Sequence, residues 1–226
     1  MALLLSLEAS ADFCSAALHN DGELIAIERI AELRSAASQL APAVQKLLHD
    51  ADVKSDSLNG IAIAAGPGSY TGLRIVTSLA KGMCSALDVP LIAVDTLDVL
   101  TNQVNNLEQI NFYCPCIDAR RNEIYYKVFD ALKHECIPTS CLVVEKESFR
   151  NFLETGRVLF FGSGAAKTVK MVSHPNADFL DGILPDAGQV GLLAYEKWRK
   201  QDFVSREQFE PFYLKEFLVG RKPETL

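Results

Sequence analysis

The positions of apolar side chains predict a chain that begins with strands. Residues 3–7 form a short apolar run, residues 13–18 form a second, and residues 23–30 form a third after the turn sequence Asn20-Asp21-Gly22. Asn and Asp followed by Gly between two strand-like runs indicate a tight hairpin. The pattern therefore predicts three antiparallel strands before any helix.

Helical spacing begins in the next segment. Between residues 35 and 51 the apolar side chains recur at intervals of three and four, at Leu40, Val44, Leu47 and Leu48. Pro42 falls inside this stripe and should kink or restart the helix. The pattern then predicts a strand over 61–65, a helix over 71–87, a strand over 91–94 and a helix that Asp95-Thr96 can cap and that ends near 105. This order of elements is typical of a mixed sheet with helices packed on it.

The second half of the chain starts again with strands. Beyond the polar residues around Asn105, the pattern predicts strands over 112–117, 123–129, 142–144 and 158–161, a short helix over 146–154, and a helix start after Gly162-Ser163-Gly164. An amphipathic helix over 186–200 and an extended piece over 210–215 follow. We expect a first lobe over 1–104 joined by 186–217, a second lobe over 105–185, and a polar tail over 218–226.

The turn between the predicted strand over 61–65 and the helix over 71–87 is the first candidate for chemistry. Glycine lets a backbone approach a ligand closely, and the amide groups at a helix N-terminus attract anions. However, Leu73 follows the last glycine where a P-loop has lysine, and the spacing is G-x-G-x-x-x-G, whereas a dinucleotide turn has G-x-G-x-x-G. A plain turn and an anion site both stay open. The candidate residues are Gly66, Gly68, Ser69, Thr71, Gly72 and Arg74.

Charge and cysteine content narrow the function classes. A protein that holds nucleic acid on its own normally has a basic surface, whereas this chain has a net charge of −7, so we expect a partner to hold any RNA. The six cysteines lack C-x-x-C spacing, which predicts free thiols in a reducing cytoplasm. No apolar run has the length of a membrane span, so we expect no contact with a membrane.

No sequence pattern supports a nucleophile or a metal centre. There is no G-x-S-x-G elbow, and the four histidines are scattered along the chain. Neither H-x-x-x-H nor H-E-x-x-H occurs. Cys114 and Cys116 lie two apart on one predicted strand, where packing is commoner than metal binding. We therefore expect no catalytic residue and no metal site.

Six short blocks of sequence occur in the order of one known family. They are LLSLE at 4–8, CSAAL at 14–18, GPGSYTGLRI at 66–75, IDAR at 117–120, EIY at 123–125 and PFYLK at 211–215. In these blocks the chain resembles the TsaB family, also called YeaZ, over nearly its whole length. The block at 66–75 is the most specific of the six.

The resemblance implies an actin-like ATPase fold (ASKHA, RNase H-like) of two lobes, α/β in class, with mixed sheets and flanking helices, in a family that has lost the catalytic apparatus. In active members of this fold, the acid that ends the first strand is followed by a glycine and a hydroxyl residue. Here Glu8, where the family usually has aspartate, is followed by Ala9 where the family usually has threonine, and Asp118 is followed by Ala119. A Cβ at those positions crowds the backbone donors against a phosphate. We interpret Glu8 and Asp118 as vestigial phosphate-loop acids or structural acids.

The resemblance also implies partners. TsaB-like proteins are scaffolds for TsaD, the subunit that transfers a threonylcarbamoyl group to N6 of adenosine 37 in tRNAs reading codons that begin with A. TsaE, a P-loop ATPase, joins them. The chain is expected to meet tRNA only through the complex and to form a homodimer when alone. The implied contact surface lies on the helices over 35–51 and 71–87, with candidate residues Leu40, Val44, Leu47, Ser78, Ala80 and Gly82.

Two other functions stay open on the sequence alone. One is an active ATP-dependent phosphotransferase of the same superfold, in which Glu8 and Asp118 manage a metal-bound phosphate. The other is a glycoprotease-like hydrolase, against which the missing metal-ligand spacing argues. We expect no firmly bound cofactor, and a nucleotide at the partner interface stays open.

Overall fold

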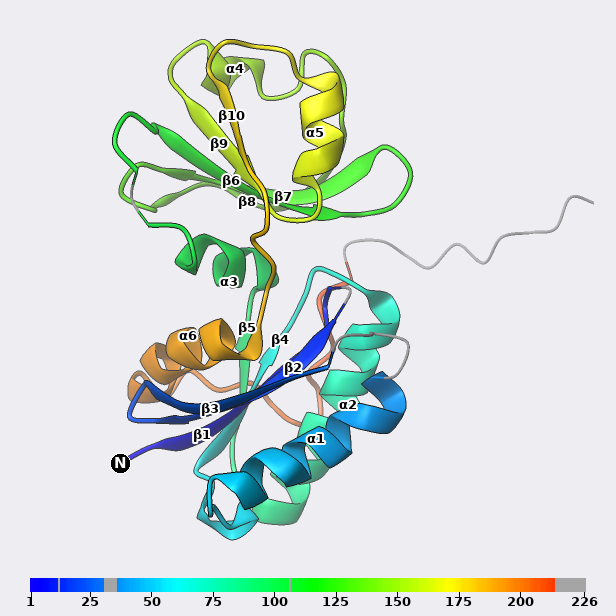
Figure 1. Cartoon of the computed structure of the whole chain (residues 1–226), viewed down its shortest axis with the longest axis vertical. Coiled ribbons are helices and arrows are strands. Elements are labelled where there is room, and N and C mark those ends of the chain that lie inside the picture. Colours follow the sequence, from blue (N-terminus) through cyan, green and yellow to red (C-terminus); the bar gives the residue numbers. More distant parts are fainter. Residues whose placement is uncertain (12, 31–35, 106, 214–226) are drawn as a thin grey trace, which may run out of the picture.

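The computed structural model describes residues 1–11, 13–30, 36–105 and 107–213. Two five-stranded sheets follow one another along the long axis of the molecule, and each has helices packed on it (Figure 1). Four of the predicted features fall at least partly outside the described residues. They are the start of the first helix at 35, the end of the extended piece over 210–215, the part of the first lobe over 214–217, and the tail over 218–226.

The first sheet has the strand order β3-β2-β1-β4-β5. Its members are β1 (Leu3–Glu8), β2 (Cys14–Asn20), β3 (Glu23–Ile30), β4 (Gly60–Ala64) and β5 (Leu91–Val94). The pairs β1/β2 and β2/β3 are antiparallel, which confirms the predicted three-strand start, and β4 and β5 extend the sheet in parallel with β1. A short 3-10 turn, η2 (Ser55–Ser57), leads into β4.

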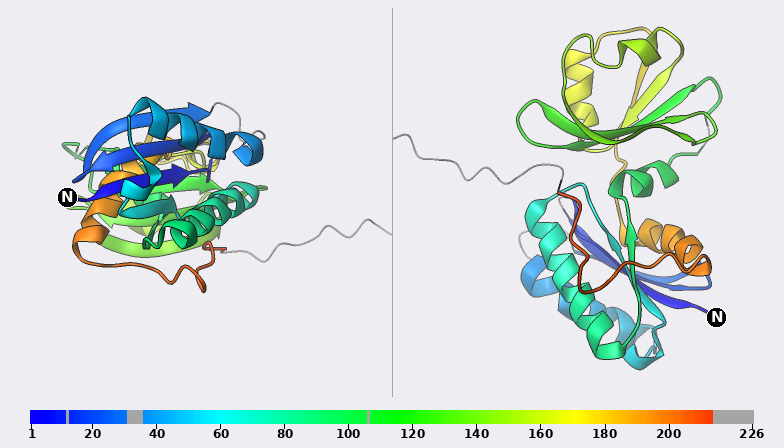
Figure 2. Two further views of the ribbon diagram at one scale, coloured as in Figure 1. Left: turned by 90° about the horizontal axis from the view of Figure 1, so that it is seen from below. Right: turned by 180° about the vertical axis from the view of Figure 1, so that it is seen from behind.

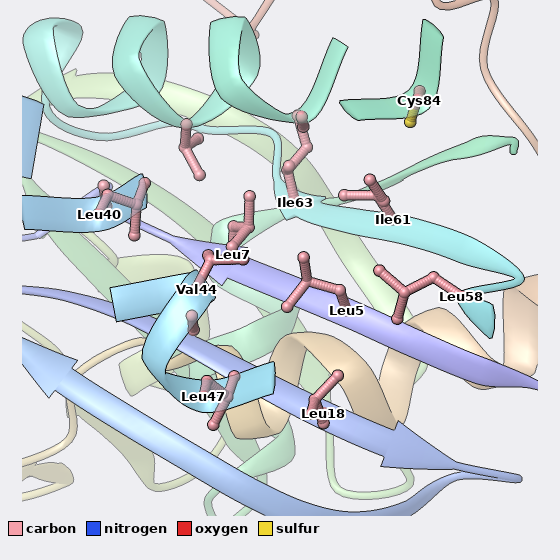
Figure 3. Close-up of a cluster of buried hydrophobic side chains, with 14 of the residues drawn as sticks. Leu5, Leu7, Leu18, Leu40, Val44, Leu47, Leu58, Ile61, Ile63 and Cys84 are labelled. Carbon is pink, nitrogen blue, oxygen red and sulfur yellow. The ribbon is translucent and has the colours of Figure 1, made fainter. Parts of the chain in front are cut away.

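Helices cover both faces of this sheet. The helices α1 (Ala36–Asp50) and α2 (Tyr70–Leu87) lie on one face, and α6 (Ala187–Arg199) lies on the other. Alternate residues of β1 therefore enter different cores: Leu5 and Leu7 pack with α1 and α2 (Figure 3), whereas Leu4 packs with α6. Burial on both faces explains why β1 and β4 are mainly apolar and do not alternate with polar residues. Pro42 lies inside α1 on its exposed side. The helix continues through this residue, so the predicted restart does not occur.

The second sheet has the order β10-β9-β6-β7-β8. Its strands are β6 (Phe112–Asp118), β7 (Glu123–Asp130), β8 (Glu135–Val143), β9 (Val158–Phe161) and β10 (Ala177–Leu180), and its short helices are α4 (Arg150–Leu153) and α5 (Ala165–Met171). The strand β8 starts earlier than the predicted 142, α4 is shorter than the predicted 146–154, and β10 was not predicted. These three elements are short or partly exposed, so their apolar pattern is weak.

The two sheets have the same topology. Each has an antiparallel meander of three strands followed by two parallel strands, with helices between them. After the last strand of each sheet, one helix packs against the opposite sheet: α3 (Thr96–Asn102) packs on β6, and α6 packs on β1 and β2. The segment that contains α6 therefore returns from the second sheet to the first.

Candidate functional site

The glycine turn connects β4 to α2 and is packed between two other segments of the chain. On one side the Ser69 amide donates to the Ser10 carbonyl oxygen at 2.8 Å, and a Cβ on Gly68 would lie 2.5 Å from that oxygen. On the other side Gly66, at φ +105°, lies against the Phe212 backbone, where a Cβ would be 3.0 Å from the carbonyl oxygen. Glycine is required at both positions because another backbone approaches so closely.

The same turn caps α2. The Ser69 hydroxyl accepts a hydrogen bond from the Gly72 amide at 3.3 Å, so Ser69 is the N-cap, while Thr71 and Arg74 are exposed on the first turns of the helix. The Ser69 and Gly72 amides already donate within the chain and are not free for an anion. Anion binding at this turn stays a prediction.

Glu8, the last residue of β1, is fully buried and bound by its own loop. The Ser10 amide donates to both carboxylate oxygens, at 2.8 and 2.9 Å, and the Ser10 hydroxyl donates to the same group. Burial raises the pKa of Glu8 to about 8, although the bonds from Ser10 oppose this shift. A carboxyl group that is mostly protonated at neutral pH is poorly suited to hold a metal-bound phosphate.

Asp118 ends β6 and is the topological equivalent of Glu8 in the second lobe. Its carboxylate accepts hydrogen bonds from the Lys167 ammonium at 2.5 Å and from the Arg120 amide at 2.6 Å. The Asp118 amide donates to the Ser163 hydroxyl at 3.1 Å. Each acid is thus held within its own lobe, and over the described ranges no hydrogen bond or ion pair joins the two.

The predicted partner-interface residues on α1 and α2 divide into two groups. Four of them have at most 4% of their surface exposed and pack in the chain's own core, as Figure 3 shows for those on α1. They are Leu40, Val44, Leu47 and Ala80. For these four the prediction of a partner surface is wrong, because the apolar stripe of each helix faces its own sheet. Ser78 and Gly82 are exposed on the outer side of α2.

The outer side of α2 carries short side chains. Ser78, Gly82, Ser85 and Ala86 are exposed, and a Cβ on Gly82 would meet no atom within 4 Å. Short side chains leave the helix backbone accessible to a second helix. We call this surface the α2 outer face.

An aromatic and cationic cluster beside the α2 outer face was missed as a unit by the sequence analysis. The rings of Tyr70 and Tyr213 lie 5.0 Å apart, and the Arg74 guanidinium carbon lies 4.7 Å from the centre of the Tyr70 ring. Tyr213 and its neighbour Phe212 are 37% and 47% exposed. The available signal was the pair of adjacent aromatic residues, Phe212 and Tyr213, in the C-terminal segment.

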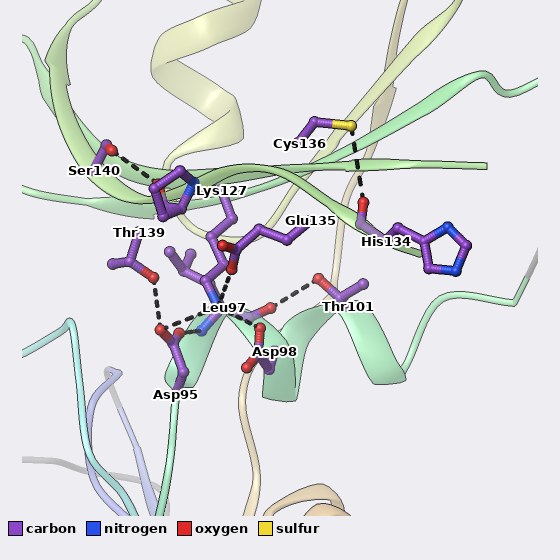
Figure 4. A network of polar contacts seen from close by, with 11 residues as sticks. Asp95, Leu97, Asp98, Thr101, Lys127, His134, Glu135, Cys136, Thr139 and Ser140 are labelled. Atoms are coloured by element: carbon purple, nitrogen blue, oxygen red, sulfur yellow. Dashed lines mark hydrogen bonds and ion pairs between the residues drawn. The ribbon is translucent and has the colours of Figure 1, made fainter. Parts of the chain in front are cut away.

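A buried lysine connects α3 with the second sheet, and it too was not predicted. The Lys127 ammonium lies 3.4 Å from Asp95, 2.7 Å from Asp98 and 3.3 Å from Glu135, while Thr139 donates to Asp95 at 2.6 Å (Figure 4). Burial lowers the pKa of Lys127, but the nearby carboxylates outweigh it and the net shift is upward. Lys127 therefore stays charged, and this cluster ties α3 to β7 and β8.

The described part of the chain has neither a metal-binding cluster nor a membrane-spanning helix. Within residues 1–11, 13–30, 36–105 and 107–213, no group of three His, Cys, Asp or Glu side chains is arranged to hold a metal ion. No helix in those ranges combines the length and the apolar character needed to cross a bilayer.

Comparison with known proteins gives the family. The family model of TsaD, described as tRNA N6-adenosine threonylcarbamoyltransferase, matches residues 30–152. A curated relative from Bacillus subtilis (strain 168), named tRNA threonylcarbamoyladenosine biosynthesis protein TsaB, is 30% identical over 173 residues, which make up 74% of this chain and 71% of the relative. The chain belongs to the TsaB family.

Solved structures agree with this assignment. YeaZ from Pseudomonas aeruginosa superposes with a TM-score of 0.79 at 27% identity, covering 95% of this chain and 100% of that chain. The activator of the 2-hydroxyisocaproyl-CoA dehydratase from Clostridium difficile, solved with ADPNP, reaches a TM-score of 0.50 at 8% identity over 88% of this chain and 97% of that chain. The second likeness concerns the fold alone. The TsaB-family chain has the predicted actin-like ATPase fold.

Proposed function

We propose that the chain is a non-catalytic subunit of the complex that installs a threonylcarbamoyl group on N6 of adenosine 37 in tRNAs reading codons that begin with A. Membership of the TsaB family supports a role in threonylcarbamoyladenosine biosynthesis. One observation supports the non-catalytic role: both acids are already engaged within the chain. The buried carboxyl group of Glu8 accepts hydrogen bonds from Ser10, and the carboxylate of Asp118 pairs with Lys167. Neither carboxyl group is available to bind the metal ion of a metal-bound phosphate, and this disfavours the phosphotransferase alternative.

In this proposal the chain acts by binding TsaD through its first lobe, taken as residues 1–104 with 186–217, while 105–185 form the second lobe. The α2 outer face supplies the contact, because its short side chains leave room for helices of a partner. The same face serves a homodimer when TsaD is absent. TsaE and tRNA meet the chain within the complex in the cytoplasm, and the net charge of −7 supports leaving the tRNA contact to a partner.

Replacing Gly82 by arginine tests the proposed contact. Its open surroundings accept the longer side chain, and removing a glycine from a helix adds about 1 kcal/mol to helix stability. We expect Gly82→Arg to unfold at the same temperature as the wild type or higher, and to bind TsaD of the same organism at least about 30-fold more weakly, because a bulky charge enters a close helix contact. Isothermal titration calorimetry and thermal unfolding measure the two quantities.

The matched control is Ala166→Arg, which makes a similar change at an exposed helical position of the second lobe. Its affinity for TsaD should stay within about twofold of the wild type. A folded Gly82→Arg variant with wild-type affinity places the contact elsewhere, and a wild-type chain that does not bind TsaD at any concentration contradicts the proposed function.

A further inference from the structure

The C-terminal segment over 200–213, here called the strap, is fixed along α2. Near the end of the helix, Arg206 donates to the Cys84 carbonyl oxygen at 3.1 Å and pairs with Asp88 at 3.0 Å. Further along, the Lys81 ammonium donates to the Glu207 carbonyl oxygen at 3.3 Å, and the Phe212 amide donates to the Ala65 carbonyl oxygen at 2.8 Å. Figure 2 shows the strap, in orange and red, crossing from α6 to α2. The strap and α2 therefore form one composite surface.

A groove of about 290 Å³ lies between the strap and α2. Its walls include Arg74, Ser78 and Lys81 from the helix and Phe209, Glu210 and Tyr213 from the strap. Because Ser78 also belongs to the α2 outer face, the groove is continuous with the surface proposed to meet TsaD.

The charge of the groove is opposite to that of the whole protein. Arg74 and Lys81 are cations and Glu210 is the single acid among its lining residues, in a chain whose net charge is −7. Within the described residues, neither Arg74 nor Lys81 forms an ion pair with a carboxylate. The groove therefore offers two positive groups, Arg74 held by the Tyr70 ring and a hydrogen bond with Tyr213, and Lys81 held by a backbone carbonyl.

Arg74 is positioned before any partner arrives. Its guanidinium stacks on Tyr70, whose ring in turn packs against Tyr213. A stacked guanidinium keeps its planar set of donors for bidentate binding of a carboxylate, and it loses less conformational freedom on binding than a free side chain. Arginine and tyrosine anchors beside apolar groups, such as the exposed Phe212, are typical of the residues that dominate binding energy at interfaces.

We propose that this groove binds an acidic side chain of TsaD, with Arg74 as the anchoring residue and the strap as part of the interface; the identity of this occupant rests on the proposed function. Charge complementarity and continuity with the α2 outer face favour an acidic protein segment over other occupants. The strap then contributes to specificity, since its Tyr213 helps to hold Arg74 where a partner carboxylate can form a charged pair with it.

Charge reversal of Arg74 tests this proposal. We expect Arg74→Glu to weaken TsaD binding at least about 10-fold at low salt, and Arg74→Lys to weaken it less, because lysine keeps the charge but loses the planar donors. The wild-type affinity should fall as salt rises, and the Arg74→Glu affinity should change less. Calorimetric titration of TsaD with each folded variant gives these dissociation constants. The control is Lys146→Glu, the same charge change at an exposed position of the second lobe, for which we expect wild-type affinity.

The outcomes separate this inference from the proposed function. If the wild type and Arg74→Glu bind TsaD equally well, the groove proposal is wrong while the proposed function stands. If Arg74→Glu loses only self-association in sedimentation equilibrium and keeps its TsaD affinity, a second copy of this chain is the occupant and the proposal is also wrong. If the wild type does not bind TsaD at all, the proposed function fails first.

Discussion

Glu8 has no exposed surface at the end of β1, and the Ser10 amide and hydroxyl both donate to its carboxylate. Its pKa rises from 4.5 to about 8 because burial disfavours the charged form. The folded chain therefore binds a proton that the unfolded chain releases between these two values. The stability that this proton contributes is complete below about pH 4.5 and is lost as the pH rises through about 8.

Replacing Glu8 by glutamine removes this titration and keeps the shape of the side chain. As the pH rises from roughly 5 to 8.5, we expect the free energy of unfolding of the wild type to fall by about 2–4 kcal/mol more than that of Glu8→Gln. Urea unfolding at both pH values measures the change, with the exposed Glu108→Gln as a control that should follow the wild type. A wild type whose stability runs parallel to that of Glu8→Gln contradicts the assignment of a buried, protonated Glu8.

The residues of the predicted partner surface show what the sequence could not determine, namely which side of each helix faces outward. The helical period correctly identifies Leu40 and Ala80 as members of regular helices, but it cannot state whether an apolar face meets the chain's own sheet or a partner. Here the sheet takes that face, and the exposed Gly82 two positions from Ala80 is left outside. A charged substitution at Ala80 would therefore test folding rather than binding.

At the scale of elements, the glycine turn and α2 act as one unit. The sequence predicts the strand, the turn and the helix here because glycines interrupt an apolar run, and it offers both Ser69 and Thr71 as capping residues. It does not predict that Gly68 packs against Ser10 and that Gly66 packs against the backbone of Phe212, because these residues are far apart in sequence. Those contacts depend on tertiary structure, as does the position of the strap along α2.

Gly68 should be far less tolerant of a side chain than Gly82. We expect Gly68→Ala to lower the free energy of unfolding by about 2–4 kcal/mol, since its Cβ would lie 2.5 Å from the Ser10 carbonyl oxygen and the β1–β2 loop would have to move. Gly82→Ala, within the helix that follows this turn, is the matched control and should be neutral or stabilising by up to about 1 kcal/mol. Chemical denaturation compares the two, and equal stability of both variants would show that the turn tolerates a Cβ.

At the scale of the whole molecule, the chain repeats one topology twice and exchanges the final helix of each half. The strand patterns of both halves were visible in the sequence, and the segment over 186–217 was expected to join the first lobe. The strand β10 and the packing of α3 on the second sheet were not predicted, because such contacts join distant segments. Lys127 shows the same limit: its carboxylate partners lie on α3 and β8 and cannot be paired by local pattern. This cluster holds α3 against the second sheet.

Because α3 and α6 each pack on the sheet of the opposite half, the two lobes are held together, as suits a protein that presents a fixed surface to a partner. We propose that TsaD requires the α2 outer face for its activity. The most direct test is reconstitution of the tRNA modification from purified TsaD, TsaE, threonylcarbamoyl-adenylate and unmodified tRNA, with and without this chain, followed by nucleoside analysis. We predict that threonylcarbamoyladenosine forms when the wild type or Ala166→Arg is added, and that it falls to background when the chain is omitted or replaced by Gly82→Arg. An equal yield of the modified nucleoside without the chain would contradict the account.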